Sequence, residues 1–293
     1  MRKYPVPHAI LYILFGILLI AAPCRAAEVL IIADAQLKPV MEVTQGMHKT
    51  LRASTRTVAP ADVRGTLAAV VQQENARVVI ALGREALAEA LNLPPSIPVI
   101  YDMVVTPPTI SRANTAGFYM ATPASEYADL VRNHLPALRR LAVVASRDFL
   151  NMLAGNVPAS VSAHTVKSMV EFVSMVKQLD NADAILLLPD NNVMNATALE
   201  EAYLHSFRRR IPLLGISERH VKEGALLALV VDMTNVGKVI GEYATKALKS
   251  GNVGQFPASP PRKFELFLNM GTARKMNISI PDEVVRMARK AYP

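Results

Sequence analysis

Short apolar segments alternate with amphipathic segments along most of the chain. The apolar segments are rich in Val, Ile and Leu, and we expect strands at 29–33, 76–82, 97–102, 116–120, 138–146, 182–190, 211–217, 225–232 and 263–269. The intervening segments have helical periodicity at about 38–53, 84–91, 122–134, 168–179, 195–209 and 234–249, and a last helix begins at 280–281. Alternation of strands and helices predicts an α/β fold.

Several of the strand segments are apolar throughout rather than alternating, as in AILLL at 184–188 and ALLALVV at 225–231. Such runs are typical of parallel strands that are buried on both faces, so we expect helices on both faces of the sheet. Four of these expected strands lie in residues 29–120 and four more lie in residues 138–232, which together are more than one sheet holds comfortably. The pattern therefore predicts two similar α/β lobes, with the C-terminal tail returning to one of them.

Individual helix ends carry local signals. Ser168 and Glu171 have the spacing of a capping box at the start of the helix at 168–179. Gly237 and Gly241, four residues apart, lie on one face of the helix at 234–249, and we expect them to permit close backbone packing near the interface between two lobes. The segment 148–166 fits the alternation least well, because Gly155 and Pro158 interrupt it and leave little room for a helix.

The N-terminus has the layout of a cleaved secretory signal peptide. Arg2 and Lys3 precede an apolar stretch at 9–22, and small residues follow up to Ala26. The apolar stretch is shorter than the roughly 20 residues that cross a bilayer core, so we expect cleavage after Ala26. Lipidation of Cys24 is the alternative, although Pro23 stands where a lipoprotein signal normally has a small residue.

Charge and cysteine content exclude several classes of function. Removing residues 1–26 takes away three of the 32 basic residues and none of the 24 acidic ones, which lowers the net charge from +8 to about +5. It also removes the single cysteine, so the mature chain has neither disulfides nor thiol chemistry. The densest basic cluster, at 208–210, ends a predicted helix, where cations are favourable. We therefore expect no nucleic-acid partner.

Motifs of catalysis and cofactor binding are missing from the sequence. It contains no GxSxG, HExxH, GxGxxG, phosphate-loop or CxxC motif. The five histidines that follow the signal segment are scattered, at positions 48, 134, 164, 205 and 220, and no two of them have metal-ligand spacing. We expect no cofactor, no metal and no enzymatic activity.

Polar residues follow one predicted strand after another. Ligands of α/β proteins bind at this edge, because helix N-termini with free N–H groups gather at the carboxyl ends of the strands. Capping of the next helix is the ordinary role of any single one of these residues. Taken together, they are our candidates for a ligand site: Asp34, Gln36, Gly83, Arg84, Asp102, Asp190, Asn191, Ser217 and Asp232.

The residues from Ala182 onward resemble the periplasmic substrate-binding proteins of ABC transporters, in the group that includes the tryptophan and tyrosine binders. ADAILLLPDNNV at 182–193 resembles that family's strand and Pro-x-Asp-Asn loop, and 209–251 is similar to its next strand, turn and helix. KFELFLNMGTARKMNISIP at 263–281 resembles its Asn-x-x-Thr-Ala segment and Ile-Pro ending. The N-terminal half is similar more loosely, through ALGREA at 81–86 and the turn at Asp102.

The sequence departs from the family in one region. The segment 148–166 is much shorter than its counterpart, and the residues Phe149-Leu150-Asn151-Met152-Leu153 replace the usual polar ones.

The resemblance implies two Rossmann-like lobes with parallel sheets, joined by a hinge of three chain crossings near 118–122, 232–236 and 251–262. Lobe 1 would comprise 27–118 plus 234–256, and lobe 2 would comprise 119–233 plus 257–293. A small organic ligand, such as an amino acid or a related compound, would lie between them. Asp190, Asn191 and Asp232 would form one wall and Asp34, Arg84 and Asp102 the other. An Asp would pair with an ammonium group, while Arg84 or Asn191 would hold a carboxylate.

The implied function is that of a periplasmic solute-binding protein that delivers its ligand to an ABC permease in the inner membrane. Two alternatives stay open. The same fold serves as a ligand-sensing module for a membrane signalling partner such as a sensor kinase, and an exported α/β enzyme could use Asp190 and Asp232 as paired carboxylates.

Overall fold

A computed structural model describes residues 27–109, 111–153 and 157–293. The expected signal peptide, its cleavage site and Cys24 lie outside the described residues. Among the helices that are described, none combines the length and the apolar character needed to cross a membrane.

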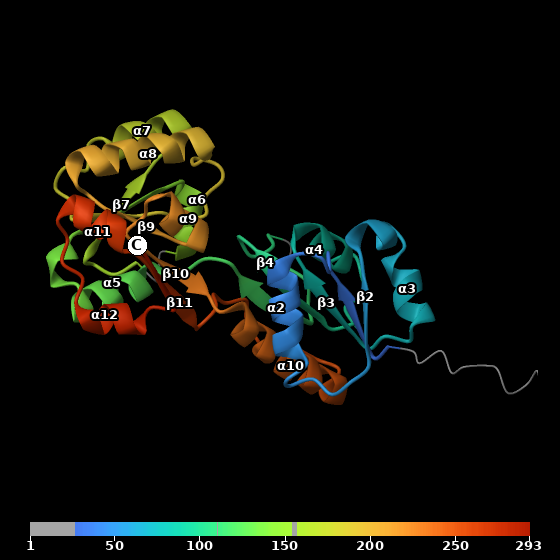
Figure 1. The fold of residues 1–293 in the computed structure, drawn as a ribbon. Coiled ribbons are helices and arrows are strands. Elements are labelled where there is room, and N and C mark those ends of the chain that lie inside the picture. The colour runs from blue at the N-terminus through green and yellow to red at the C-terminus, as the bar shows by residue number, and fades with distance from the viewer. Residues whose placement is uncertain (1–26, 110, 154–156) are drawn as a thin grey trace, which may run out of the picture.

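Two separate sheets form the framework, as Figure 1 shows. The first is entirely parallel, in the order β2-β1-β3-β4-β5. Its strands are β1 (Val29–Ile32), β2 (Thr55–Val58), β3 (Val78–Leu82), β4 (Val99–Val104) and β5 (Thr115–Tyr119). The second has the order β12-β11-β10-β9-β8-β6-β7 and is parallel except between β10 and β11. Its strands are β6 (Leu141–Ala145), β7 (Val161–Thr165), β8 (Ala184–Leu186), β9 (Leu213–Gly215), β10 (Leu227–Val231), β11 (Phe264–Asn269) and β12 (Lys290–Tyr292).

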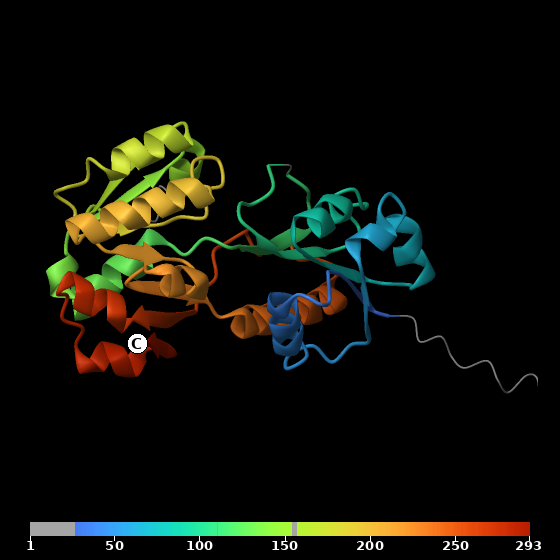
Figure 2. The same cartoon turned by 45° about the horizontal axis from the view of Figure 1, so that its top comes forward.

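Helices cover both faces of each sheet (Figure 2). Around the first sheet lie α2 (Lys38–Met47), the 3₁₀ turn η1 (Pro60–Val63), α3 (Leu67–Gln73), α4 (Arg84–Ala90) and α10 (Met233–Ser250). Around the second lie α5 (Ala124–His134), η2 (Pro136–Leu138), α6 (Arg147–Leu153), α7 (Met169–Val176), α8 (Ala196–Arg209), α9 (Glu218–Glu223), α11 (Met270–Met276) and α12 (Asp282–Met287).

The side chains of β1 show why helices pack on both faces of the first sheet. All four are fully buried, and they alternate between two hydrophobic clusters. Leu30 and Ile32 pack on the side of α3 and α4, whereas Val29 and Ile31 pack on the side of α2 and α10. The predicted α/β class with parallel sheets is confirmed.

The segment 148–166 differs from the expectation. The structure places the seven-residue helix α6 at its start and the edge strand β7 near its end. Two helical turns suffice to return the chain to the sheet, so the alternation of strand and helix continues here. Residues 154–156, which include Gly155, lie outside the described part of the chain.

Three chain crossings connect the two sheets, after β5, after β10 and before β11. The crossings hydrogen-bond to one another. The amide of Tyr119 donates to the carbonyl of Ser259 at 3.2 Å, and the amide of Ser259 donates to the carbonyl of Gly117 at 3.2 Å. The amide of Asp232 donates to the carbonyl of Lys263 at 3.0 Å. The crossings therefore form one narrow hydrogen-bonded connection between the two bodies.

Glycines let α10 lie directly against α2. A Cβ added at Gly237 would lie 2.0 Å from the carbonyl oxygen of Val43, and one at Gly46 would lie 2.0 Å from that of Thr234. At Gly241 an added Cβ would lie 2.3 Å from the hydroxyl of Thr50, which donates to the carbonyl of Lys238 at 2.7 Å. The predicted close packing at 237 and 241 is confirmed, and the partner is α2 of the same body.

We predict that Gly237→Ala lowers the free energy of unfolding by about 1–3 kcal/mol, because the new methyl group has to displace helix backbone rather than a flexible side chain. Chemical denaturation measures the change. The matched control is Glu242→Ala on the exposed face of α10, which should change stability by less than about 0.5 kcal/mol. Equal effects of the two substitutions would contradict the close contact.

Candidate functional site

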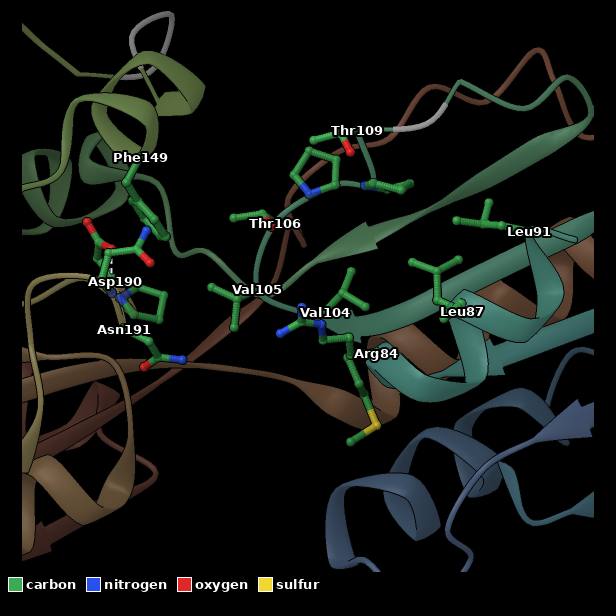
Figure 3. A pocket seen from close by; sticks show the side chains of 16 residues that line it. Arg84, Leu87, Leu91, Val104, Val105, Thr106, Thr109, Phe149, Asp190 and Asn191 are labelled. Carbon is green, nitrogen blue, oxygen red and sulfur yellow. Dashed lines mark hydrogen bonds between the residues drawn. The ribbon is translucent and has the colours of Figure 1, made fainter. Parts of the chain in front are cut away.

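A cavity of about 520 Å³ lies where the carboxyl ends of the two sheets face each other (Figure 3). One wall comes from the first sheet and consists of α4 and the loop that follows β4. The other comes from the second sheet and consists of the β6–α6 and β8–α8 junctions. These are the edges at which α/β proteins bind ligands.

On the first wall, Arg84 begins α4 and its side chain is exposed. It forms no ion pair with any described residue. Leu87 and Leu91 follow at helical spacing and supply an apolar surface below it. Figure 3 shows Arg84 and Asn191 reaching from opposite walls into the space between them.

On the second wall, Asp190 connects the two junctions. One carboxylate oxygen accepts a hydrogen bond from the amide of Ser146 at 2.7 Å, and the other accepts one from the amide of Asn192 at 3.1 Å. The residue is only 2% exposed. Its carboxylate thus holds the end of β6 beside the end of β8 and presents Asn191 to the cavity, a positioning role that the sequence did not indicate.

Backbone irregularity in β4 shapes the floor of the cavity. The pairing of β4 with β5 shifts register between Tyr101 and Val104, and Met103 within this bulge has a φ of 61°. Positive φ is unfavourable for a residue with a Cβ, so the surrounding sheet has to hold it in place. Met103 lines both this cavity and a second one.

The second cavity, of about 730 Å³, lies between the start of α2, the crossing before α10 and the β9–α9 junction. Ser217 and Asp232 line it, and both cap helices. The hydroxyl of Ser217 accepts from the amide of His220 at 3.2 Å, and the carboxylate of Asp232 accepts from that of Asn235 at 2.8 Å. These two candidates are therefore near each other but apart from Arg84, Asp190 and Asn191.

Four candidates line neither of these two cavities: Asp34, Gln36, Gly83 and Asp102. The carboxylate of Asp34 accepts from the amide of Gln36 at 3.1 Å in the turn before α2. Gly83, with a φ of 101°, donates its amide to the carbonyl of Asp102 at 2.9 Å. These hydrogen bonds stabilise the backbone next to the two cavities.

Asp102 is fully buried, and neither of its carboxylate oxygens has a hydrogen-bond partner among the described residues. Burial raises the pKa of Asp102 to about 7, because an ionised carboxylate is costly in an apolar environment. Asp102 lies within β4 rather than after it, so its carboxylate is buried in the protein instead of facing the first cavity.

Several residues that line the first cavity are not among the candidates predicted from the sequence. They are Met103, Leu87, Leu91 and the loop that contains Thr106 and Thr109. The helical spacing of the two leucines is a signal for packing in general, and only the fold shows that they face a cavity. Phe149, which replaces a polar residue of the family pattern, also lines this cavity.

A family model described as ABC transporter substrate binding protein matches residues 59–292. The chain belongs to this family. A curated relative, the uncharacterized protein RP367 of Rickettsia prowazekii (strain Madrid E), is 26% identical over 137 residues. That alignment covers 46% of this chain and 45% of the relative, so the chain matches about half the length of that protein.

Solved structures show the same fold at low sequence identity. The ligand-free, open structure of CD0873, a substrate-binding protein with adhesive properties from Clostridium difficile, has a TM-score of 0.67 at 14% identity over 91% of this chain and 99% of that one. The ABC domain in complex with L-Trp from Streptococcus pneumonia has a TM-score of 0.54 at 17% identity over 90% and 99%. The architecture is that of type I periplasmic-binding-protein-like folds.

We predict that Asp102→Asn stabilises the protein at neutral pH. A carboxyl whose pKa is raised by folding supports stability while it is protonated, and that contribution is lost as the pH rises from about 4 to 7. Asparagine is neutral throughout, so the variant should match the wild type near pH 4 and exceed it by up to about 4 kcal/mol at pH 8. Denaturant unfolding across this range measures the difference. Parallel pH profiles of the two proteins would contradict an unpaired buried carboxyl.

Proposed function

We propose that this protein is a periplasmic solute-binding protein that captures a small organic ligand between its two lobes and delivers it to an ABC permease in the inner membrane. The observation that carries the proposal is the cavity whose walls come from both bodies, at the carboxyl ends of both sheets, in a chain of the substrate-binding family. Export by a cleaved signal peptide at 1–26 is part of the proposal.

The lobes of the proposal are 27–118 plus 234–256 and 119–233 plus 257–293. Sheet membership supports this division, since α10 packs on α2 while β11 and β12 extend the second sheet. Ligand contacts are assigned to Arg84 and Asn191, with Asp190 positioning the second wall. Ser217 and Asp232 belong to the adjoining cavity, and Asp34, Gln36, Gly83 and Asp102 support the turns.

Two features of Asp190 and Asp232 support a protein that binds its ligand without catalysing a reaction. A catalytic pair has to act on the same atoms, yet Asp190 and Asp232 line different cavities. Each also accepts backbone amides, which fixes its position as a structural acceptor. The geometry favours a solute-binding protein over an enzyme that uses Asp190 and Asp232 as paired carboxylates.

We predict that a ligand raises the melting temperature of the chain from Ala27 onward. Screening amino acids, nucleosides, sugars and small organic acids should find one that adds roughly 2.7 kcal/mol at about 100 times its dissociation constant, a shift of several degrees. Asn191→Ala should reduce this shift. The control, Asn181→Ala, changes an exposed asparagine of the same lobe outside both cavities and should leave it unchanged.

Two results would contradict the proposal. Cooperative unfolding with no shift from any compound would indicate that the cavity does not take such solutes. Equal shifts in the wild type and in Asn191→Ala would place the binding site elsewhere.

A further inference from the structure

Two charged side chains line the first cavity, Arg84 and Asp190, and their situations are opposite. Asp190 is 2% exposed, and each of its oxygens already accepts a backbone amide. Arg84 is exposed and has no ion-pair partner among the described residues. The charge that the cavity offers to a ligand is therefore positive.

The rest of the lining is apolar or neutral. Leu87 of α4 and Leu91 directly after it form an apolar surface on one wall. Val104 at the end of β4 and Val105 in the loop that follows extend this surface. Phe149 contributes an aromatic ring from the other wall. Neutral polar groups come from Asn191, Asn192, Thr106 and Thr109. Such a lining accommodates an apolar body and can hydrogen-bond to a charged group without adding a charge.

The carboxylates that line the second cavity form ion pairs or hydrogen bonds with nearby residues. Glu265 pairs with Arg289 at 3.0 Å, and Glu42 pairs with Lys38 at 3.7 Å. Asp232 caps α10. Among the described residues that line these two cavities, no carboxylate is left without a polar partner.

We propose that the ligand is an organic carboxylate with an apolar body and no ammonium group. This inference rests on the proposed function and names its substrate class. Arg84 pairs with the carboxylate, which Asn191 approaches from the opposite wall, and the apolar body packs against Leu87, Leu91 and Phe149. It replaces the pairing of an Asp with an ammonium group that the family resemblance implies.

The physical reason for selectivity is the cost of an unpaired charge. An amino acid would bring an ammonium group into the first cavity, where the carboxylate of Asp190 is buried and both of its oxygens already accept backbone amides. Desolvating that unpaired cation would oppose binding. The deaminated acid of the same shape avoids this cost. The site thus discriminates in two ways. Arg84 pairs with the carboxylate of either compound, and the lack of a free carboxylate in the site disfavours the ammonium group of the amino acid.

Matched compounds test the inference in the chain from Ala27 onward. Isothermal titration calorimetry compares 3-phenylpropionate with L-phenylalanine and 4-methylpentanoate with L-leucine, and it adds the neutral amides of the two acids. At least one carboxylate should bind, and its amino acid and its amide should each bind at least ~10-fold more weakly, a difference of about 1.4 kcal/mol.

Two arginine variants test whether Arg84 causes the preference for the carboxylate. Arg84→Gln should abolish the preference for the carboxylate over its amide, because glutamine keeps the polar contact without the charge. The control, Arg52→Gln, changes another exposed arginine without a described partner that does not line either cavity, and it should leave the preference intact. Thermal unfolding of both variants verifies that they are folded.

Each other outcome has a definite meaning. If an amino acid binds as tightly as its deaminated acid, or if only a sugar or nucleoside from the broader screen binds, the inference is wrong and the proposed function stands. If a carboxylate binds equally well to Arg84→Gln, the assignment of Arg84 is wrong. If nothing in either set binds to the folded protein, both the inference and the proposed function fail.

Discussion

Hydrogen bonds between the three chain crossings are the constraint on which the arrangement of this protein depends. They join the segment at 117–119 to Ser259, and Asp232 to Lys263, so that the two bodies are held together along one narrow connection. The two walls of the first cavity lie beside the carboxyl ends of strands, with α4 and the loop after β4 on one side and the β6–α6 and β8–α8 junctions on the other. The placement of the cavity and of its two walls follows from this connection.

Local contacts fix the positions of the elements on either side of the crossings. On one side, Gly46 and Gly237 bring α10 against α2, which ties the segment after the second crossing to the first sheet. On the other side, the carboxylate of Asp190 joins the ends of β6 and β8 and sets the position of Asn191. Asp190 and Asn191 are thus held in place by backbone hydrogen bonds, whereas Arg84 is exposed at the start of α4 and has no ion-pair partner among the described residues.

Much of the fold could be predicted from the sequence, because buried strands such as β1 and β3 read as uninterrupted apolar runs. The capping box at Ser168 marked the start of α7, and its hydroxyl accepts the amide of Glu171. The edge strands β2 and β7 could not be found this way, because most of their side chains are exposed or half-buried and include Thr, Arg and His. For the site, the rule that polar residues after strands gather at one edge found Arg84, Asp190 and Asn191. The same rule does not distinguish a buried side chain, such as that of Asp102, from a side chain that lines the cavity.

The central claim is that a solute binds between the two bodies and draws them together. Small-angle X-ray scattering of the chain from Ala27 onward, with and without the compound that most raises its melting temperature, tests this directly. The account predicts that the radius of gyration falls when the compound is bound and that Asn191→Ala weakens this response. A radius of gyration that does not change while the compound is bound would contradict it.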